Sequence, residues 1–163
     1  MKIAIVSDVH DNQVNLKKCL DWLKKEKIKE MVYCGDITNN ETLDILAKGF
    51  PGKIYLVKGN AEIYKEEDLE KYKNIEYGGK VGIFSVGDRI VGVCHEPFLI
   101  DSILEKERVD MIFHGHTHRP WIREKEKIRI INPGTLGAMF MRATFGIWDS
   151  ETGKLELKIL DEL

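Results

Sequence analysis

Seven polar residues of the kinds that bind metal ions stand directly after short apolar segments of this 163-residue chain. Each apolar segment has the length and composition of a buried β-strand. Because binding residues in open α/β sheets collect beyond the carboxyl ends of the strands, the pattern requires a fold that brings those ends together. The seven, which include four of the five histidines, are Asp8, His10, Asp36, Asn60, His95, His116 and His118.

The first third of the chain alternates between predicted strands and helices. Strands are predicted over residues 2–7, 30–34 and 53–57, where apolar residues run together. Helices are predicted over residues 15–25 and 41–50, where leucines recur at helical spacing. This alternation indicates parallel strands that are joined by right-handed crossovers.

The rest of the chain is richer in strands. A hairpin is predicted over residues 81–94 with its turn at Gly87-Asp88, followed by a helix over 98–106 and a strand over 110–114. Four further strands imply a second sheet, and they are predicted over residues 121–123, 128–131, 144–148 and 155–160. We therefore expect one domain over residues 1–163, folded as a four-layer α/β/β/α sandwich of two mixed sheets flanked by helices.

The charge balance argues against some classes of partner. The chain has 25 basic and 27 acidic residues, a net charge of −2, and no basic stripe, so neither nucleic acid nor an anionic membrane surface is an expected partner. The apolar N-terminal stretch is too short for a signal peptide, and nothing approaches a membrane span. Three cysteines without C-x-x-C spacing favour a reducing compartment, so we expect a cytoplasmic protein. A homo-oligomer remains an open alternative.

The seven polar residues combine carboxylate, amide and imidazole groups. Such a mixture suits Mn, Ni, Fe, Co or Zn better than Ca or Mg. Asp36 is the natural bridge between two ions, because one carboxylate offers an oxygen to each. Two ions about 3.5–4 Å apart lower the pKa of a bound water towards about 7 and hold the attacking and departing oxygens of a displacement. That geometry suits phosphoester hydrolysis, with the bridging hydroxide as nucleophile.

The residues, in this order, resemble the pattern of the calcineurin-like metallophosphoesterase superfamily, which reads D-x-H, G-D, G-N-H-D/E, a lone histidine and G-H-x-H. The resemblance covers nearly the whole chain. With Asn132-Pro133-Gly134-Thr135, the chain looks most like the small, single-domain YfcE-type phosphodiesterases, which have the same four-layer sandwich. The resemblance implies a first metal on Asp8, His10, Asp36 and His118, and a second on Asp36, Asn60, His95 and His116.

Three positions near these motifs are of further interest. Asn12 matches an asparagine of the family and is expected beside the substrate, whereas Asp11 replaces the usual glycine and either adds an oxygen to the site or repels substrate. Ala61 stands where the superfamily has the histidine that protonates the leaving group. Since a general acid contributes about 10²- to 10⁴-fold, we expect a slow enzyme that prefers good leaving groups. Asp36, Asn60 and His95 are the expected catalytic residues around the hydroxide.

Two functions remain in competition. The first is a dinuclear metal-dependent phosphoesterase that hydrolyses small phosphodiesters, with monoesters as a second substrate class. The alternative is a metal-binding scaffold for protein interaction, like the retromer subunit of the same fold. His114 is interpreted as a packed histidine, although it is the one imidazole left to replace the missing acid. Met139-Phe140-Met141 is predicted to be a buried strand, with a subunit contact or a substrate wall as alternatives.

Overall fold

The computed structural model describes residues 1–163, which form eleven strands and three α-helices. The helices are α1 (Gln13–Lys25), α2 (Asn40–Gly49) and α3 (Ile100–Lys106), with short 3₁₀ helices at Glu66–Lys71, Pro97–Leu99 and Leu160–Glu162. The strands are β1 (Lys2–Val6), β2 (Glu30–Tyr33), β3 (Lys53–Leu56), β4 (Ile75–Tyr77), β5 (Val81–Val86), β6 (Arg89–Cys94), β7 (Met111–Phe113), β8 (Trp121–Lys125), β9 (Ile128–Asn132), β10 (Thr144–Asp149) and β11 (Leu155–Ile159).

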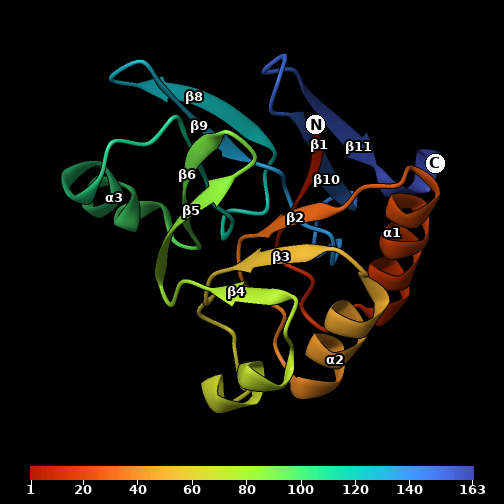
Figure 1. Cartoon of the computed structure of the whole chain (residues 1–163). Helices are drawn as coiled ribbons and strands as arrows, with labels where there is room; N and C mark the ends of the chain where they lie inside the picture. The colour runs from red at the N-terminus through yellow and green to blue at the C-terminus, as the bar shows by residue number, and fades with distance from the viewer.

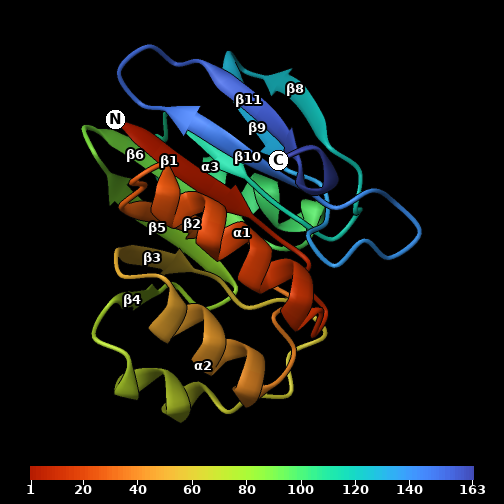
Figure 2. The same cartoon turned by 90° about the vertical axis from the view of Figure 1, so that its right-hand side faces the viewer.

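The strands form two mixed sheets that lie against each other, with helices outside them (Figure 1). The first sheet has the order β11-β10-β1-β2-β3-β4, and the second has the order β5-β6-β7-β9-β8. Figure 2 shows α1 and α2 side by side on the outer face of the first sheet, whereas α3 packs on the outer face of the second. The four-layer α/β/β/α sandwich is therefore confirmed.

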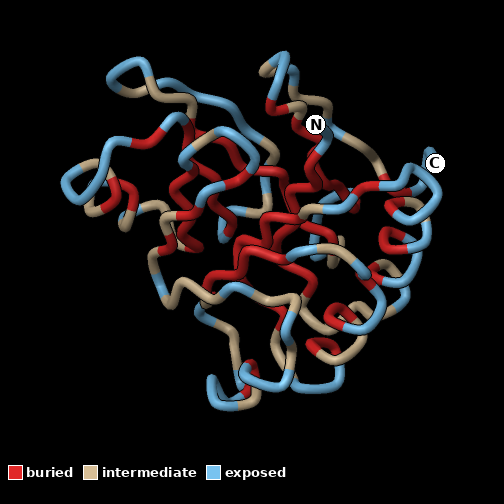
Figure 3. Tube along the Cα trace, viewed as in Figure 1, coloured by how far each residue is buried: buried red, intermediate tan, exposed pale blue.

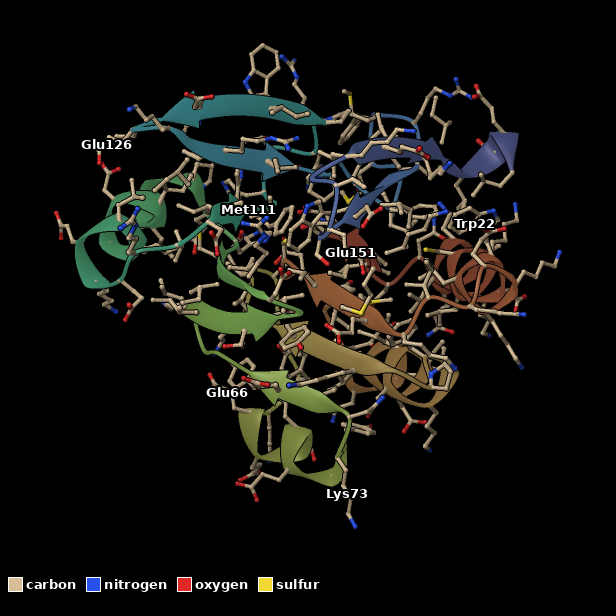
Figure 4. The ribbon with its side chains drawn as sticks, turned by 45° about the horizontal axis from the view of Figure 1, so that its top comes forward. Trp22, Glu66, Lys73, Met111, Glu126 and Glu151 are labelled. Carbon is tan, nitrogen blue, oxygen red and sulfur yellow. The ribbon has the colours of Figure 1, made fainter.

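Strand alternation divides the apolar residues between the layers. In β1, Ile3 and Ile5 face the second sheet, whereas Ala4 and Val6 face the helices. The helix-side core is the larger of the two, and the buried residues run through the centre of the molecule in Figure 3. Met111 of β7 belongs to the core between the sheets and lies near the middle of the molecule in Figure 4. The inner faces of the two sheets therefore pack on each other, and helices cover most of the outer face of the first sheet and part of the outer face of the second.

The register of the parallel strands places their ends at one level. In the first sheet, Val6 pairs with Tyr33, which pairs with Leu56. In the second sheet, Val93 of β6 pairs with Phe113 of β7. The loops that follow these strands therefore start side by side, and they carry the seven polar residues described above.

The structure differs from the sequence-based expectation in three places. Strands β10 and β11 join the first sheet, because β10 pairs antiparallel with β1. The short strand β4 was not expected. The prediction of a buried strand at 139–141 is wrong, because these residues form an exposed bend in which Phe140 is 98% exposed. None of the helices has the length and apolar character that a membrane crossing requires.

Candidate metal centre

The loops beyond the strands turn sharply at the candidate ligands themselves. Five of the seven have positive φ, a conformation that is uncommon outside glycine. Each such residue costs on the order of 1 kcal/mol or more, and strain of this kind clusters at functional sites. The five are Asp8 (55°), His10 (45°), Asp36 (61°), His116 (70°) and His118 (58°).

Two glycines let neighbouring backbone approach the buried aspartates. A Cβ at Gly59 would lie 2.0 Å from Asp36 Oδ1, and a Cβ at Gly115 would lie 2.6 Å from Asp8 Oδ2. Neither position has room for a side chain. The glycines in the sequence motifs are therefore required for close packing around the carboxylates.

The first group of donor atoms comes from Asp8, His10 and His118. Asp8 Oδ1 lies 3.2 Å from His118 Nε2 and 3.6 Å from His10 Nε2. The two imidazole Nε2 atoms are 3.1 Å apart. All three side chains thus direct a donor atom to one point.

The second group comes from Asp8, Asp36 and His95, all of them buried. Asp36 Oδ2 lies 3.1 Å from His95 Nε2 and 3.5 Å from His10 Nε2. Asp8 Oδ1 is 3.9 Å from His95 Nε2. Both aspartates therefore stand between the two groups, whereas the family resemblance implies only Asp36 in that position.

The donor sets fit divalent ions. Ligands about 2.0–2.2 Å from one ion lie roughly 3.0–3.5 Å from each other, close to the separations measured here. His95 Nδ1 donates to the Cys34 carbonyl oxygen at 2.7 Å, which leaves Nε2 as the atom with a free lone pair. That Nε2 is buried and faces the Asp36 carboxylate, 3.1 Å away. A ring held in this way is the usual arrangement of a metal-binding histidine.

Asn60 and His116 extend the site towards solvent. Asn60 Oδ1 lies 2.9 Å from His116 Nδ1, and both residues are exposed. The His116 ring packs edge-on against the His95 ring, with 5.2 Å between their centroids. The structure therefore brings all seven side chains together, five of them within the two donor groups and these two beside the second group.

Hydrogen bonds orient the Asp8 carboxylate. Ser7 Oγ donates to Asp8 Oδ2 at 2.5 Å, and the His116 backbone N–H donates to the same oxygen at 3.1 Å. Thr135 Oγ1 donates to the Asp8 carbonyl oxygen at 2.8 Å. The Ser7 and His116 bonds hold Oδ2 on the protein side. The His116 N–H also lies 3.3 Å from Oδ1, the oxygen that faces the histidines.

Glu62 is a positioning residue for Asp36 that the sequence interpretation missed. Its Oε1 accepts hydrogen bonds from the backbone N–H groups of Asp36 (2.7 Å), Ile37 (3.2 Å) and Gly59 (3.2 Å), and its Oε2 accepts from Thr38 N (2.7 Å). One side chain thereby fixes the turn that carries Asp36. The available signal was the acid two residues after Asn60, in the last position of the G-N-H-D/E motif.

Asp11 and Asn12 make structural hydrogen bonds next to His10. Asn12 Oδ1 accepts from Asn15 N and caps α1, while its Nδ2 donates to the Gly137 carbonyl oxygen. Asp11 Oδ1 accepts from Thr42 Oγ1 at 2.8 Å. These contacts join the loops around the site, and a role for either residue beside the substrate stays a prediction.

The charges of the donor groups shift one another's proton affinity. The Asp8 carboxylate raises the pKa of His10. Burial lowers the pKa of His95, but the Asp36 and Asp8 carboxylates outweigh burial, so this pKa is raised. Burial likewise raises the pKa of Asp36, but the His95 imidazole outweighs burial, so this pKa is lowered. Without an ion, protons on His10 and His95 therefore serve as counter-charges to the two carboxylates.

His114 lies outside the two donor groups. The residue is buried, and its Nδ1 donates to the Gly115 carbonyl oxygen at 3.0 Å. Burial lowers its pKa, which disfavours the protonated ring that a general acid requires. The interpretation of a packed, hydrogen-bonded histidine is the one that these contacts support.

Comparison with known proteins places the chain among phosphoesterases. Residues 1–153 match the sequence profile of the calcineurin-like phosphoesterase superfamily domain. Phosphodiesterase MJ0936 of Methanocaldococcus jannaschii is 25% identical to this chain over an alignment 170 residues long. The alignment covers 93% of this chain and 94% of that protein.

Two solved structures share the fold. The structure of an archaeal phosphodiesterase superposes with a TM-score of 0.85 at 22% identity, covering 98% of this chain and 99% of that one. Vacuolar protein sorting 29 from Cryptosporidium parvum superposes with a TM-score of 0.68 at 16% identity, covering 97% and 95% of the two chains. At these identities the superpositions establish a common architecture.

Replacement of Glu62 tests how far the site depends on its four backbone hydrogen bonds. Glu62→Gln places an N–H group where an oxygen now accepts, so we expect metal affinity to fall by about 10- to 100-fold. Isothermal titration with Mn²⁺ measures the change. Glu67→Gln is the matched control, because Glu67 is exposed and has only a long contact with Lys65. Equal affinity for both variants would contradict the positioning role.

Metal-induced stabilisation should increase with pH. The raised pKa values of His10 and His95 give the metal-free protein a stability contribution that is complete below about pH 6.5 and lost as the pH rises through the folded-state values. A metal ion must displace those protons. At a fixed Mn²⁺ concentration, we therefore expect a larger increase in Tm at about pH 8 than at about pH 6. Calorimetry, with the chelator-treated protein as reference, measures the increase in Tm at each pH. An increase in Tm that does not change with pH would refute the role of the histidine protons.

Proposed function

The chain belongs to the calcineurin-like phosphoesterase superfamily, and on this premise we propose that it is a dinuclear metal-dependent phosphodiesterase that acts on small phosphoesters. One observation carries the proposal. Two buried aspartates and three histidines form two donor groups with Asp8 in common. A dinuclear phosphoesterase needs such an arrangement, because two cations must be held next to each other.

The side chains divide into two sets of ligands. We assign Asp8, His10 and His118 to one ion, and Asp36, His95, Asn60 and His116 to the other, with Asp8 and Asp36 between them. Divalent ions bound there would supply a water that loses a proton near neutral pH and would neutralise the charge of the phosphoryl group. The donor set suits Mn, Ni, Fe, Co or Zn.

The candidate ligands differ in exposure, so the site has a buried side and a side that is open to solvent. Asp8, Asp36 and His95 form its buried floor, whereas Asn60 and His116 lie at the exposed side. Two dications would outweigh the two aspartate charges, so the loaded site would attract a phosphate anion. We infer that the phosphoryl group enters past Asn60 and His116. A single domain, a cytoplasmic location and a homo-oligomer stay predictions.

Ala61 limits the leaving groups that the enzyme can release. Its backbone N–H donates to Asp36 Oδ1 at 2.8 Å, which places the residue at the site. Its methyl side chain has no proton to donate to a departing oxygen. Esters of good leaving groups, such as aryl phosphates, depart without that proton and are the favoured class.

An interaction scaffold remains the second candidate. Met139, Phe140 and Met141 are all exposed, and exposed apolar residues are typical of interaction surfaces. The converging donor atoms favour the enzyme, since a scaffold does not need them. Two bound ions without hydrolysis of any phosphoester would support the scaffold instead.

Metal reconstitution tests the proposed activity. The protein is stripped with a chelator, loaded singly with Mn, Ni, Co, Fe, Zn or Mg, and assayed on bis(nitrophenyl) phosphate and nitrophenyl phosphate. We expect metal-dependent hydrolysis that favours the diester, and a loss of about 10²-fold or more in Asp36→Asn. Asp21→Asn, on the exposed face of α1, is the control and should keep full activity. Undiminished activity after chelation would refute the mechanism.

A histidine at position 61 should broaden the leaving groups that are tolerated. Ala61→His adds a general acid, so hydrolysis of alkyl phosphodiesters should rise by up to about 10²-fold while nitrophenyl esters change little. Ala61→Gln controls for side-chain size without adding an acid. The ratio of kcat/KM values for alkyl and aryl esters is the measurement. Rapid turnover of alkyl esters by the unchanged protein would show that Ala61 is not limiting.

A further inference from the structure

A pocket of about 520 Å³ opens on the outer face of the second sheet. The metal centre does not account for it. Two of its residues are arginines and one is a tryptophan, a combination suited to anionic and planar groups. The lining residues, which we call the arginine pocket, are Pro97, His114, Thr117, Arg119, Trp121 and Arg123.

Strand alternation places Trp121 and Arg123 on the same face of the second sheet. In β8, Ile122 pairs with Ile131, which belongs to the core between the sheets. Trp121 and Arg123 therefore project from the opposite face of the sheet, the face on which α3 packs. The turn between β8 and β9, labelled by Glu126 in Figure 4, lies beyond them at the edge of the molecule.

The arginine pocket adjoins the metal centre through one short segment. His114 and Thr117 line the pocket, whereas His116 and His118 are candidate metal ligands. Asn132 fixes this segment, because its Nδ2 donates to Thr117 Oγ1 at 2.9 Å and to the Gly115 carbonyl oxygen at 2.8 Å. A substrate whose phosphoryl group lies at the metals would reach the pocket across this segment.

The pocket carries uncompensated positive charge. The arginine ion pairs of the structure involve Arg89 and Arg142, so Arg119 and Arg123 have no carboxylate partner. Both are exposed. A free guanidinium offers two parallel N–H groups to a phosphate or a carboxylate, which is its preferred ligand geometry.

The remaining walls suit a flat ring. Trp121 is 64% exposed and lines the pocket together with Pro97. An indole ring stacks on a nucleobase with little dependence on which base it is, because every base has a flat π-face. In His114, Nδ1 donates to a carbonyl oxygen, which leaves Nε2 as an acceptor for an N–H or O–H group of the ligand.

We propose that the arginine pocket binds the unreactive arm of the substrate, and that this arm is a nucleoside carrying a second phosphate. The inference rests on the proposed phosphodiesterase function, whose substrate class it names. Arg119 and Arg123 bind the second phosphate, and Trp121 stacks on the base. The residues determine specificity and take no part in bond cleavage.

Three nitrophenyl phosphodiesters with the same leaving group test the proposal: bis(nitrophenyl) phosphate, thymidine 5′-(nitrophenyl phosphate), and the latter compound with a 3′-phosphate. We expect kcat/KM to increase in that order, by roughly tenfold for the added phosphate. In Arg119→Ala/Arg123→Ala this last increase should disappear through a higher KM, while bis(nitrophenyl) phosphate is hydrolysed as before. Trp121→Ala should lower the preference for both nucleoside esters. Arg108→Ala, another exposed arginine, is the control and should change nothing.

Binding of thymidine 3′,5′-bisphosphate, measured by titration calorimetry, separates this inference from the proposed function. Binding that requires the two arginines, in a protein that hydrolyses none of the esters, would support the pocket and overturn the phosphodiesterase. Equal hydrolysis of all three esters by the unchanged protein and the arginine variant would overturn the pocket and leave the phosphodiesterase standing. Failure of the bisphosphate to bind the metal-loaded protein would also overturn the pocket.

Discussion

The structure depends on the burial of two negative charges in one place. Asp8 and Asp36 are 0% and 2% exposed, and two like charges out of water are tolerated only when cations or hydrogen bonds compensate for them. Three histidines, the Ser7 hydroxyl and the backbone N–H groups of Ala61 and His116 surround these carboxylates. The left-handed turns and the side-chain-free glycines follow from the same requirement, since without them the loops could not close around the two acids.

The sequence predicted the parts that depend on residue type and strand order. The candidate ligands were identified because each follows an apolar strand, and register in β1, β2 and β3 brings those strand ends together. The place of Asp8 in both donor groups depends on which carboxylate oxygen Ser7 engages, a detail that no spacing encodes. The role of Glu62 depends on four N–H groups converging on one side chain, and this geometry exists only in the folded loop.

The pattern of apolar residues gave wrong predictions where segments of similar composition occupy different places in the fold. Strands β9 and β10 are both short and apolar, yet one joins the second sheet and the other the first, because alternation records burial and not the identity of the neighbouring strand. Met139, Phe140 and Met141 are apolar but exposed. The loop before them is pinned, since Gly137 N donates to the Asp8 carbonyl oxygen, and this attachment directs the chain outwards before β10 begins.

An aspartate that belongs to two donor groups makes their occupancies interdependent. In the proposed centre, an ion held by Asp8, His10 and His118 would fix the Asp8 carboxylate rotamer and weaken its oxygen as a donor towards the group of Asp36 and His95. A second ion would then meet a site that the first had altered. The affinity of each site would then depend on whether the other site is occupied. A coupling free energy would then set the state of the protein at limiting metal, and titration curves would report macroscopic constants of the pair.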